Sequence, residues 1–206
     1  PKAGTQIPNK FTHVIFKFKS QNAKGKSTSQ KSKIGESYLY YNDVRQFGWI
    51  KIIKTKDLKT IPFFRDLGPE PFNGLTFDIF KNIVSRSNLA IKPLIMDQKK
   101  IAGIGNIYAN DALFDAEIDP RRKAKTLKPE EIKKLYNSIL KVLKNGLENG
   151  GASELNFVNA LGQEGKYQHH FLAYSRDGQK CLRGDGIMKK ITLGGRGTYF
   201  CENCQK

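Results

Sequence analysis

Gly103-Ile104-Gly105-Asn106-Ile107-Tyr108 decides how the middle of this chain folds. The glycines favour a tight turn, and the residues after it place Ile107, Ala112 and Leu113 where they can share one face of a helix. Asn106 stands where an N-cap residue would begin that helix. Backbone N–H groups at such a helix start bind phosphate well, although an ordinary capped helix without a ligand is the commoner case.

Helical periodicity continues on both sides of this stretch. Residues 77–84 space apolar side chains as one helix face. Downstream, Pro129 suits the first turn of a helix, and Gly150-Gly151 suits its end. The apolar stripe of this second helix comprises Ile132, Leu135, Ile139, Val142 and Leu143.

The two ends of the chain favour strands instead. β-branched and aromatic residues predict strands over residues 12–18, 37–41 and 49–53 near the start. Shorter ones are predicted at 171–174, 187–193 and 198–200. The run Leu67-Gly68-Pro69-Glu70-Pro71 breaks regular structure and is a candidate linker. Together these patterns predict an α+β protein with more than one part.

Composition narrows the function. Of 206 residues, 36 are Lys or Arg and 19 are Asp or Glu, which gives a net charge of +17 and predicts a polyanionic partner, most often nucleic acid. No apolar run approaches the ~18 residues of a membrane span. Three cysteines do not form a disulfide framework, and they favour metal binding or inert thiols in a reducing cytosol.

The cysteines have a metal-like spacing. Cys201-Glu202-Asn203-Cys204 is a CxxC pair, and Cys181 lies upstream where a hairpin could bring it back. The position three after Cys181 is Gly184, so a fourth cysteine is missing, and Asp185 is a weak substitute. A zinc site and three reduced thiols held by packing both remain open.

Two further clusters could touch a nucleic acid. Gly194-Gly195-Arg196-Gly197-Thr198 lets the backbone approach a ligand and offers a guanidinium to phosphate, or it is a hairpin turn with a solvated arginine. Arg45 and Phe47 place a cation and an aromatic ring two residues apart, where they could enter a base stack; otherwise Phe47 is core and Arg45 is solvated.

Five segments of the chain form a recognisable series: Tyr41–Gly48, Leu67–Pro71, Ile91–Gln98 with Gly103–Ala109, Gly162–Gln168 and Gly194–Gln205. In this order they resemble the C-terminal part of the formamidopyrimidine-DNA glycosylase family, which includes the endonuclease-VIII-like proteins. They are similar, respectively, to that family's loop that fills the gap left by a flipped base, its interdomain stretch, its helix–two-turns–helix element, its lesion-capping loop and its terminal zinc finger.

The resemblance implies roles for residues of the DNA-binding surface. Arg45 would pair with the base opposite the lesion, and Phe47 would wedge beside it. Lys92 and Asn106 would hold phosphates that flank the damaged nucleotide. Tyr167, in the lesion loop, would also contact DNA.

The remaining implied roles belong to the C-terminal finger. Arg196 would grip phosphate and act as the catalytic proton donor of the second elimination. Cys181, Cys201 and Cys204 would bind one structural zinc ion, with Gly184 in place of the fourth cysteine.

The implied fold is α+β. Residues 1–66 would be the remaining strands of an N-terminal catalytic β-sandwich, and residues 67–168 a helical DNA-binding domain with the helix–two-turns–helix and the lesion loop. Residues 169–206 would form a zinc-finger-like β-hairpin.

The implied partner is double-stranded DNA with oxidised or abasic sites. We expect the protein to be a monomer without membrane contact, located in the bacterial cytoplasm with the nucleoid.

The implied activity is that of a DNA glycosylase and AP lyase of base-excision repair. It would remove oxidised purines such as formamidopyrimidine and 8-oxoguanine, then nick the abasic strand by β,δ-elimination. The family's nucleophile is a proline followed by glutamate, whereas Pro1 here precedes Lys2-Ala3-Gly4, so we expect this polypeptide to bind DNA without efficient catalysis. The alternatives are a non-catalytic damaged-DNA-binding protein that keeps only the clamp and, more weakly, an RNA-binding zinc-ribbon protein.

Overall fold

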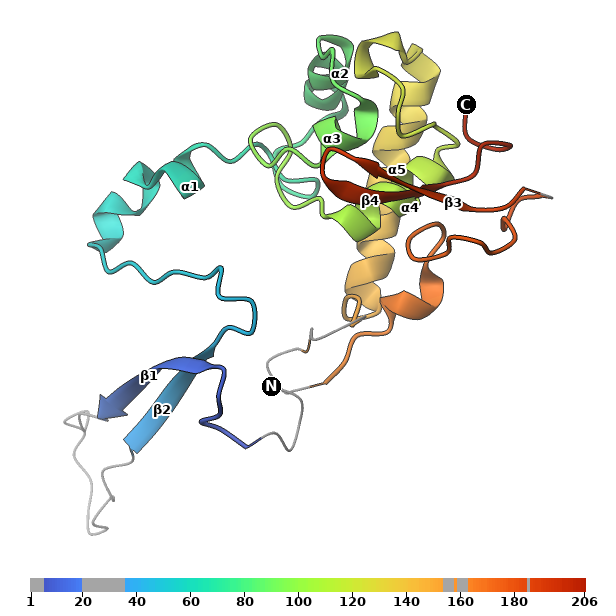
Figure 1. Ribbon diagram of the computed structural model, residues 1–206. Coiled ribbons are helices and arrows are strands. Elements are labelled where there is room, and N and C mark those ends of the chain that lie inside the picture. Colours follow the sequence, from blue (N-terminus) through green and yellow to red (C-terminus); the bar gives the residue numbers. More distant parts are fainter. Residues whose placement is uncertain (1–5, 20–35, 154–157, 159–162, 185) are drawn as a thin grey trace, which may run out of the picture. The chain divides into compact units, whose positions relative to one another are not determined.

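The computed structural model describes residues 6–19, 36–153, 158, 163–184 and 186–206 (Figure 1). It combines helices with two small antiparallel sheets. The chain divides into two compact units, with the boundary between Ile53 and Lys54 and a short piece near Gln163 grouped with the first unit. The second unit contains every helix of the described residues and the C-terminal hairpin.

The first unit is built on one hairpin. Strands β1 (Thr12–Lys19) and β2 (Glu36–Asn42) pair antiparallel, with Ile15 opposite Tyr40. These two strands confirm the predictions over 12–18 and 37–41. The strand predicted over 49–53 is wrong: within the described chain these residues pair with no strand, and Ile52 is 91% exposed. A strand-prone sequence becomes a strand only where a neighbour supplies hydrogen bonds.

The second unit contains eight helical segments among its described residues, three of them 3₁₀ turns. They are η1 (Thr55–Thr60), α1 (Pro62–Arg65), α2 (Phe77–Ser85), α3 (Ile91–Ile95), α4 (Asn106–Asp115), η2 (Ala124–Thr126), α5 (Pro129–Glu148) and η3 (Tyr167–His170). No helix of the described chain has both the length and the apolar character of a membrane-crossing segment.

The core of this unit lies where α5 packs against α2 and α4. The predicted stripe of α5 is confirmed, since its first four members are buried and Leu143 packs at the edge. In α4, Ala112 and Leu113 are buried as predicted and Ile107 is half-buried. Two polar residues of α4, Asn110 and Asp111, are also buried. Helix α4 therefore has a polar buried face beside its apolar one.

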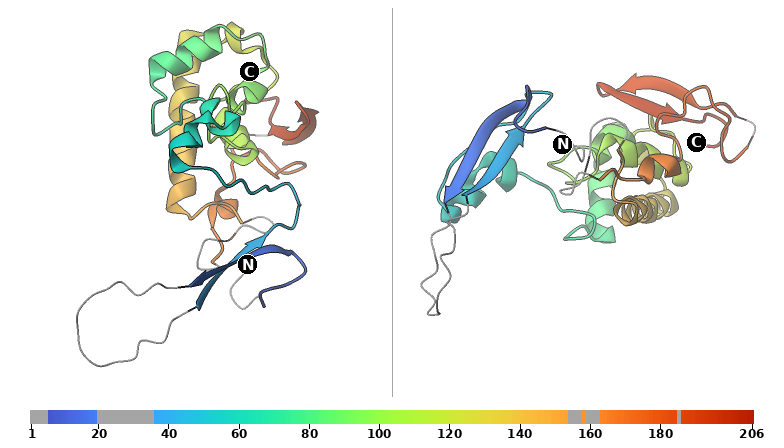
Figure 2. Two further views of the ribbon diagram at one scale, coloured as in Figure 1. Left: turned by 90° about the vertical axis from the view of Figure 1, so that its left-hand side faces the viewer. Right: turned by 90° about the horizontal axis from the view of Figure 1, so that it is seen from below.

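A second hairpin lies beside α4 (Figures 1 and 2). Its strands are β3 (Lys189–Leu193) and β4 (Arg196–Phe200), joined by Gly194 and Gly195, both with positive φ. The predicted strands at 187–193 and 198–200 are thus confirmed within two residues. Residues 171–174, predicted as a strand, form turns and bends instead.

Candidate nucleic-acid interface and metal centre

Lys92 joins the helical body to the C-terminal hairpin. Its ammonium donates hydrogen bonds to Asn106 Oδ1 at 2.7 Å, the Gly197 carbonyl at 2.9 Å and Thr198 Oγ1 at 2.8 Å. The residue is 1% exposed, so these three bonds use every N–H of the ammonium away from bulk water. Burial, together with the positive charge of Arg196, lowers the pKa of Lys92 to about 8.

This environment contradicts the role predicted for Lys92. A phosphate contact needs a free donor, and all three donors already have protein acceptors. Lys92 instead connects α3, the start of α4 and strand β4. Sequence alone could not show this, because a lysine near glycines looks the same whether it is solvated or enclosed.

Asn106 is the first residue of α4. The N-cap is Gly105, so the prediction of Asn106 as N-cap is off by one residue. The Asn106 side chain is half-buried, and its Nδ2 donates to the Gly197 carbonyl at 3.2 Å. Gly105 is exposed, and a Cβ placed there would meet no atom within 4 Å. The N-terminus of α4 is therefore open to an approaching anion.

Arg196 lies next to this helix start. It begins β4 and is exposed, and its charge acts on the Lys92 ammonium. The turn before it rests against α3, since a Cβ on Gly194 would lie 3.2 Å from Pro93 Cγ. The structure thus brings three predicted site residues, Lys92, Asn106 and Arg196, to one place from three elements.

The polar face of α4 anchors the chain that leads into the hairpin. Asn110 Oδ1 accepts the backbone N–H of Tyr199 at 2.8 Å. The Asp111 carboxylate accepts the N–H groups of Ala173 at 2.9 Å and Tyr174 at 3.0 Å. Burial raises the pKa of Asp111, and these hydrogen bonds oppose the shift. Sequence reasoning missed both residues; the available signal was two adjacent polar residues inside an otherwise apolar helix.

The burial of Tyr167 contradicts the prediction that its side chain contacts DNA. Its side chain is fully buried, and its hydroxyl donates to Asp111 Oδ2 at 3.0 Å. Its ring packs against those of Tyr108 and Phe171. A side-chain contact with DNA is incompatible with this burial, so Tyr167 anchors the base of the predicted lesion loop. Of that loop, Gly162 lies outside the described residues.

The first unit carries a separate exposed loop. Asp43 organises it by accepting the N–H groups of Arg45 at 3.0 Å, Gln46 at 2.8 Å and Gly48 at 2.6 Å. The hydrogen bond from Gly48 is the largest cause of the lowered pKa of Asp43. Phe47 is 76% exposed, and the Arg45 guanidinium lies 5.0 Å from the centre of its ring. The Phe47 ring is therefore exposed on a loop that the Asp43 hydrogen bonds keep ordered, and it is available to contact a binding partner.

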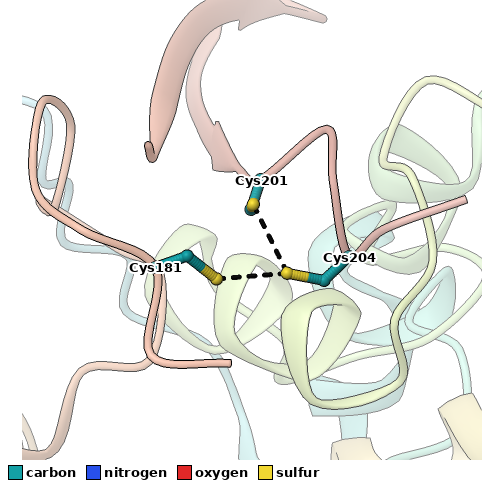
Figure 3. A group of neighbouring side chains, drawn as sticks. All are labelled: Cys181, Cys201 and Cys204. Carbon is teal, nitrogen blue, oxygen red and sulfur yellow. Dashed lines mark hydrogen bonds between the residues drawn. The ribbon is translucent and has the colours of Figure 1, made fainter. Parts of the chain in front are cut away.

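Cys181, Cys201 and Cys204 form one cluster (Figure 3). Cys204 Sγ lies 3.1 Å from that of Cys181 and 3.4 Å from that of Cys201, and all three sulfurs fall within 4.8 Å of one another. Tetrahedral zinc with bonds of about 2.3 Å separates its sulfur ligands by about 3.8 Å. The three thiols therefore fit a zinc ion.

Backbone N–H groups support the thiolate form of this cluster. The N–H of Arg183 donates to Cys181 Sγ at 3.4 Å. Burial opposes ionisation of Cys201, but hydrogen bonds from the N–H and thiol of Cys204, the N–H of Asn203 and the thiol of Cys181 outweigh it and lower its pKa. Burial and the neighbouring sulfurs raise the pKa of Cys204 to about 12. A cation between the sulfurs would remove this conflict.

Two protein-family models match this chain, one over the helical part and one over the cysteine-bearing end. Residues 67–157 match the family model described as "Formamidopyrimidine-DNA glycosylase H2TH domain", and residues 178–206 match "Zinc finger found in FPG and IleRS". A formamidopyrimidine-DNA glycosylase of Pelotomaculum thermopropionicum is 40% identical over 206 residues, which cover 99% of this chain and 69% of the relative. The chain spans between 62% and 69% of the first three curated relatives it matches.

Solved structures are similar as well. The Lactococcus lactis enzyme bound to DNA containing an abasic site superposes with a TM-score of 0.76 at 33% identity, covering 87% of this chain and 68% of that one. A variant of the same protein bound to DNA containing Fapy-dG gives 0.76 at 32% identity with the same coverage.

Proposed function

Because the chain belongs to the formamidopyrimidine-DNA glycosylase family, we propose that it acts in base-excision repair on double-stranded DNA. The proposed targets are oxidised purines and the abasic sites left by their removal. The relatives solved with abasic and Fapy-dG DNA support these targets.

The observation that carries the proposal is the meeting of Asn106 and Arg196 at one buried ammonium. Asn106 and the open N-terminus of α4 offer neutral donors, and Arg196 offers a charged fork. Such a combination suits a phosphate of the DNA backbone. Lys92 holds the two elements that carry these donors at a constant spacing.

We assign the lyase contribution of this chain to Arg196. In the second elimination the carbon–oxygen bond between sugar and phosphate breaks, and its electron pair goes to the phosphate oxygen. A guanidinium that already holds the phosphate can stabilise the negative charge on that oxygen and donate a proton to it. Arg45 and Phe47 would fill the space of the extruded nucleotide, Phe47 by stacking and Arg45 by pairing with the opposite base.

The finer organisation is proposed on the same basis. The β1–β2 hairpin would be part of a catalytic β-sandwich covering residues 1–66, followed by the helical domain over 67–168 and the finger over 169–206. Cys181, Cys201 and Cys204 would hold one structural zinc ion, which would join the two ends of the finger to each other. The protein would work as a monomer in the bacterial cytoplasm.

Binding to lesion-containing DNA tests the proposal. We would compare the affinity for a duplex with a stable abasic-site analogue, the same duplex undamaged, and a structured RNA over a range of salt concentrations. A preference for the abasic duplex that persists at high salt supports the repair function. Equal binding to all three polyanions would refute it.

A non-catalytic role in binding damaged DNA is the second candidate, because Asn106, Arg196 and the open N-terminus of α4 can hold a phosphate without any covalent step. Borohydride trapping separates the two roles, because it reduces the Schiff base that joins a lyase to its abasic substrate. A trapped covalent adduct supports the glycosylase/lyase. Lesion-specific binding without any adduct supports the binding protein.

A further inference from the structure

The two glycines that follow Cys181 have different surroundings. At Gly186 a Cβ would fall 2.5 Å from Cys201 Sγ and 3.2 Å from Asn203 Cβ. Gly184 is exposed, and a Cβ there would meet no atom within 4 Å. The close approach of Cys201 Sγ therefore requires glycine at position 186, whereas no neighbouring atom requires glycine at position 184.

The turn that would present a fourth ligand is nonetheless present. In Cys181-Leu182-Arg183-Gly184 the N–H of Arg183 bonds to the sulfur two residues back, at 3.4 Å. This is the local geometry that lets a CxxC turn aim its first and fourth side chains at one ion. Position 184 is therefore the place in this turn from which a CxxC motif supplies its second ligand, and glycine offers no donor atom there.

Zinc takes four ligands in a tetrahedron, and a site with three protein ligands keeps the fourth for a molecule from solution. The cluster supplies three thiolates, whose softness favours a further sulfur ligand. We propose that the metal held by Cys181, Cys201 and Cys204 keeps an exchangeable coordination position beside Gly184, which a low-molecular-weight thiol occupies. This inference rests on the proposed zinc site, and it concerns ligand exchange at that site.

Cobalt(II) substitution in the full chain reports the ligand set directly, because each thiolate adds its own charge-transfer absorption. We expect one ion per chain with the intensity of three thiolates in thiol-free buffer. Adding 2-mercaptoethanol should raise the intensity by about one third, since a fourth thiolate joins three. A single bound ion that shows no response to the thiol would overturn the open position while leaving the zinc site intact; no bound ion would overturn both.

Gly184→Cys provides a second readout. It should give the four-thiolate spectrum, lose the response to 2-mercaptoethanol and bind zinc about tenfold more tightly or better. Gly184→Ser adds the side chain without sulfur, and Leu182→Cys adds sulfur at an exposed neighbour; both should behave like the original chain. If Gly184→Cys leaves spectrum, thiol response and affinity unchanged, position 184 does not face the ion and the proposal fails.

Discussion

Lys92 donates a 2.7 Å hydrogen bond to the amide oxygen of Asn106 and thereby sets the orientation of that amide. With the oxygen facing the ammonium, the NH₂ group of Asn106 faces the hairpin and bonds to the Gly197 carbonyl. An NH₂ group has two hydrogens, so a second donor is available to a ligand. In the proposed function, the buried lysine would therefore act on DNA binding through Asn106, as a positioning residue.

The pKa of Lys92 makes the stability of the second unit depend on pH. Since its folded-state pKa is about 8 against an ordinary 10.5, the unfolded chain binds the proton more tightly. The cost of burying the charged form is present in full below about pH 8 and disappears as the pH rises toward about 10.5. The unfolding free energy should therefore rise relative to Lys92→Met over this window, by at most about 3 kcal/mol.

Urea unfolding followed by far-UV circular dichroism measures this effect, because the helices found in the described part of the chain belong to the second unit. Profiles of the original chain and Lys92→Met that stay parallel from about pH 7 to about pH 10 would show that Lys92 does not titrate in this range.

Arg196→Ala should weaken DNA binding through the loss of a phosphate contact. The affinity for damaged and undamaged duplexes should fall by a similar factor, and the slope of log affinity against log salt should decrease by about one. Lys133→Ala, on the exposed side of α5, removes one charge as well and serves as the control. Equal losses in the two variants would indicate that Arg196 contributes only net charge.

Phe47→Ala should lower the preference for lesion-containing DNA without destabilising the protein. The ring is 76% exposed, so its removal costs little folding energy, whereas a wedge in a base stack contributes about 1–3 kcal/mol. Ile52→Ala, at 91% exposure in the same unit, is the matched truncation. The ratio of affinities for abasic and intact duplexes is the measurement, and an unchanged ratio in Phe47→Ala argues against the wedge.

Asp111→Leu should destabilise the second unit strongly. It would leave the N–H groups of Ala173 and Tyr174 and the hydroxyl of Tyr167 without their buried acceptor, at a cost of about 3 kcal/mol or more. Asp111→Asn keeps one acceptor oxygen and should lose less. Thermal unfolding of the two variants gives the comparison, and equal losses would mean that shape rather than hydrogen bonding determines the effect.

The sequence predicted those features of the fold that depend on residues close together in the chain, namely helix faces and a hairpin turn. The stripe of α5 and the apolar positions of α4 follow from the helical repeat, and Gly194-Gly195 marks a hairpin turn that needs positive φ. The strand predicted over 49–53 failed because strand formation depends on a distant partner.

The sequence singled out three residues that lie together in the structure, but it did not predict the surroundings of Lys92. Lys92, Asn106 and Arg196 converge, yet the enclosure of Lys92 arises from Gly197 and Thr198, about a hundred positions away in the sequence. The resemblance of its loop predicts a DNA contact for Tyr167, whereas its burial against Asp111 depends on tertiary packing. Long-range burial of polar groups leaves no periodic signature.

The polar buried face of α4 makes the C-terminal hairpin a poor candidate for transplantation. Asp111 accepts hydrogen bonds from the backbone upstream of β3, and Asn110 accepts one from the backbone of β4, so these N–H groups lose their acceptors without that helix. Recombination or engineering that exchanges the cysteine-bearing segment between proteins must carry α4 with it. The cysteine-bearing segment is contiguous in sequence, but in this chain part of its hydrogen bonding depends on α4.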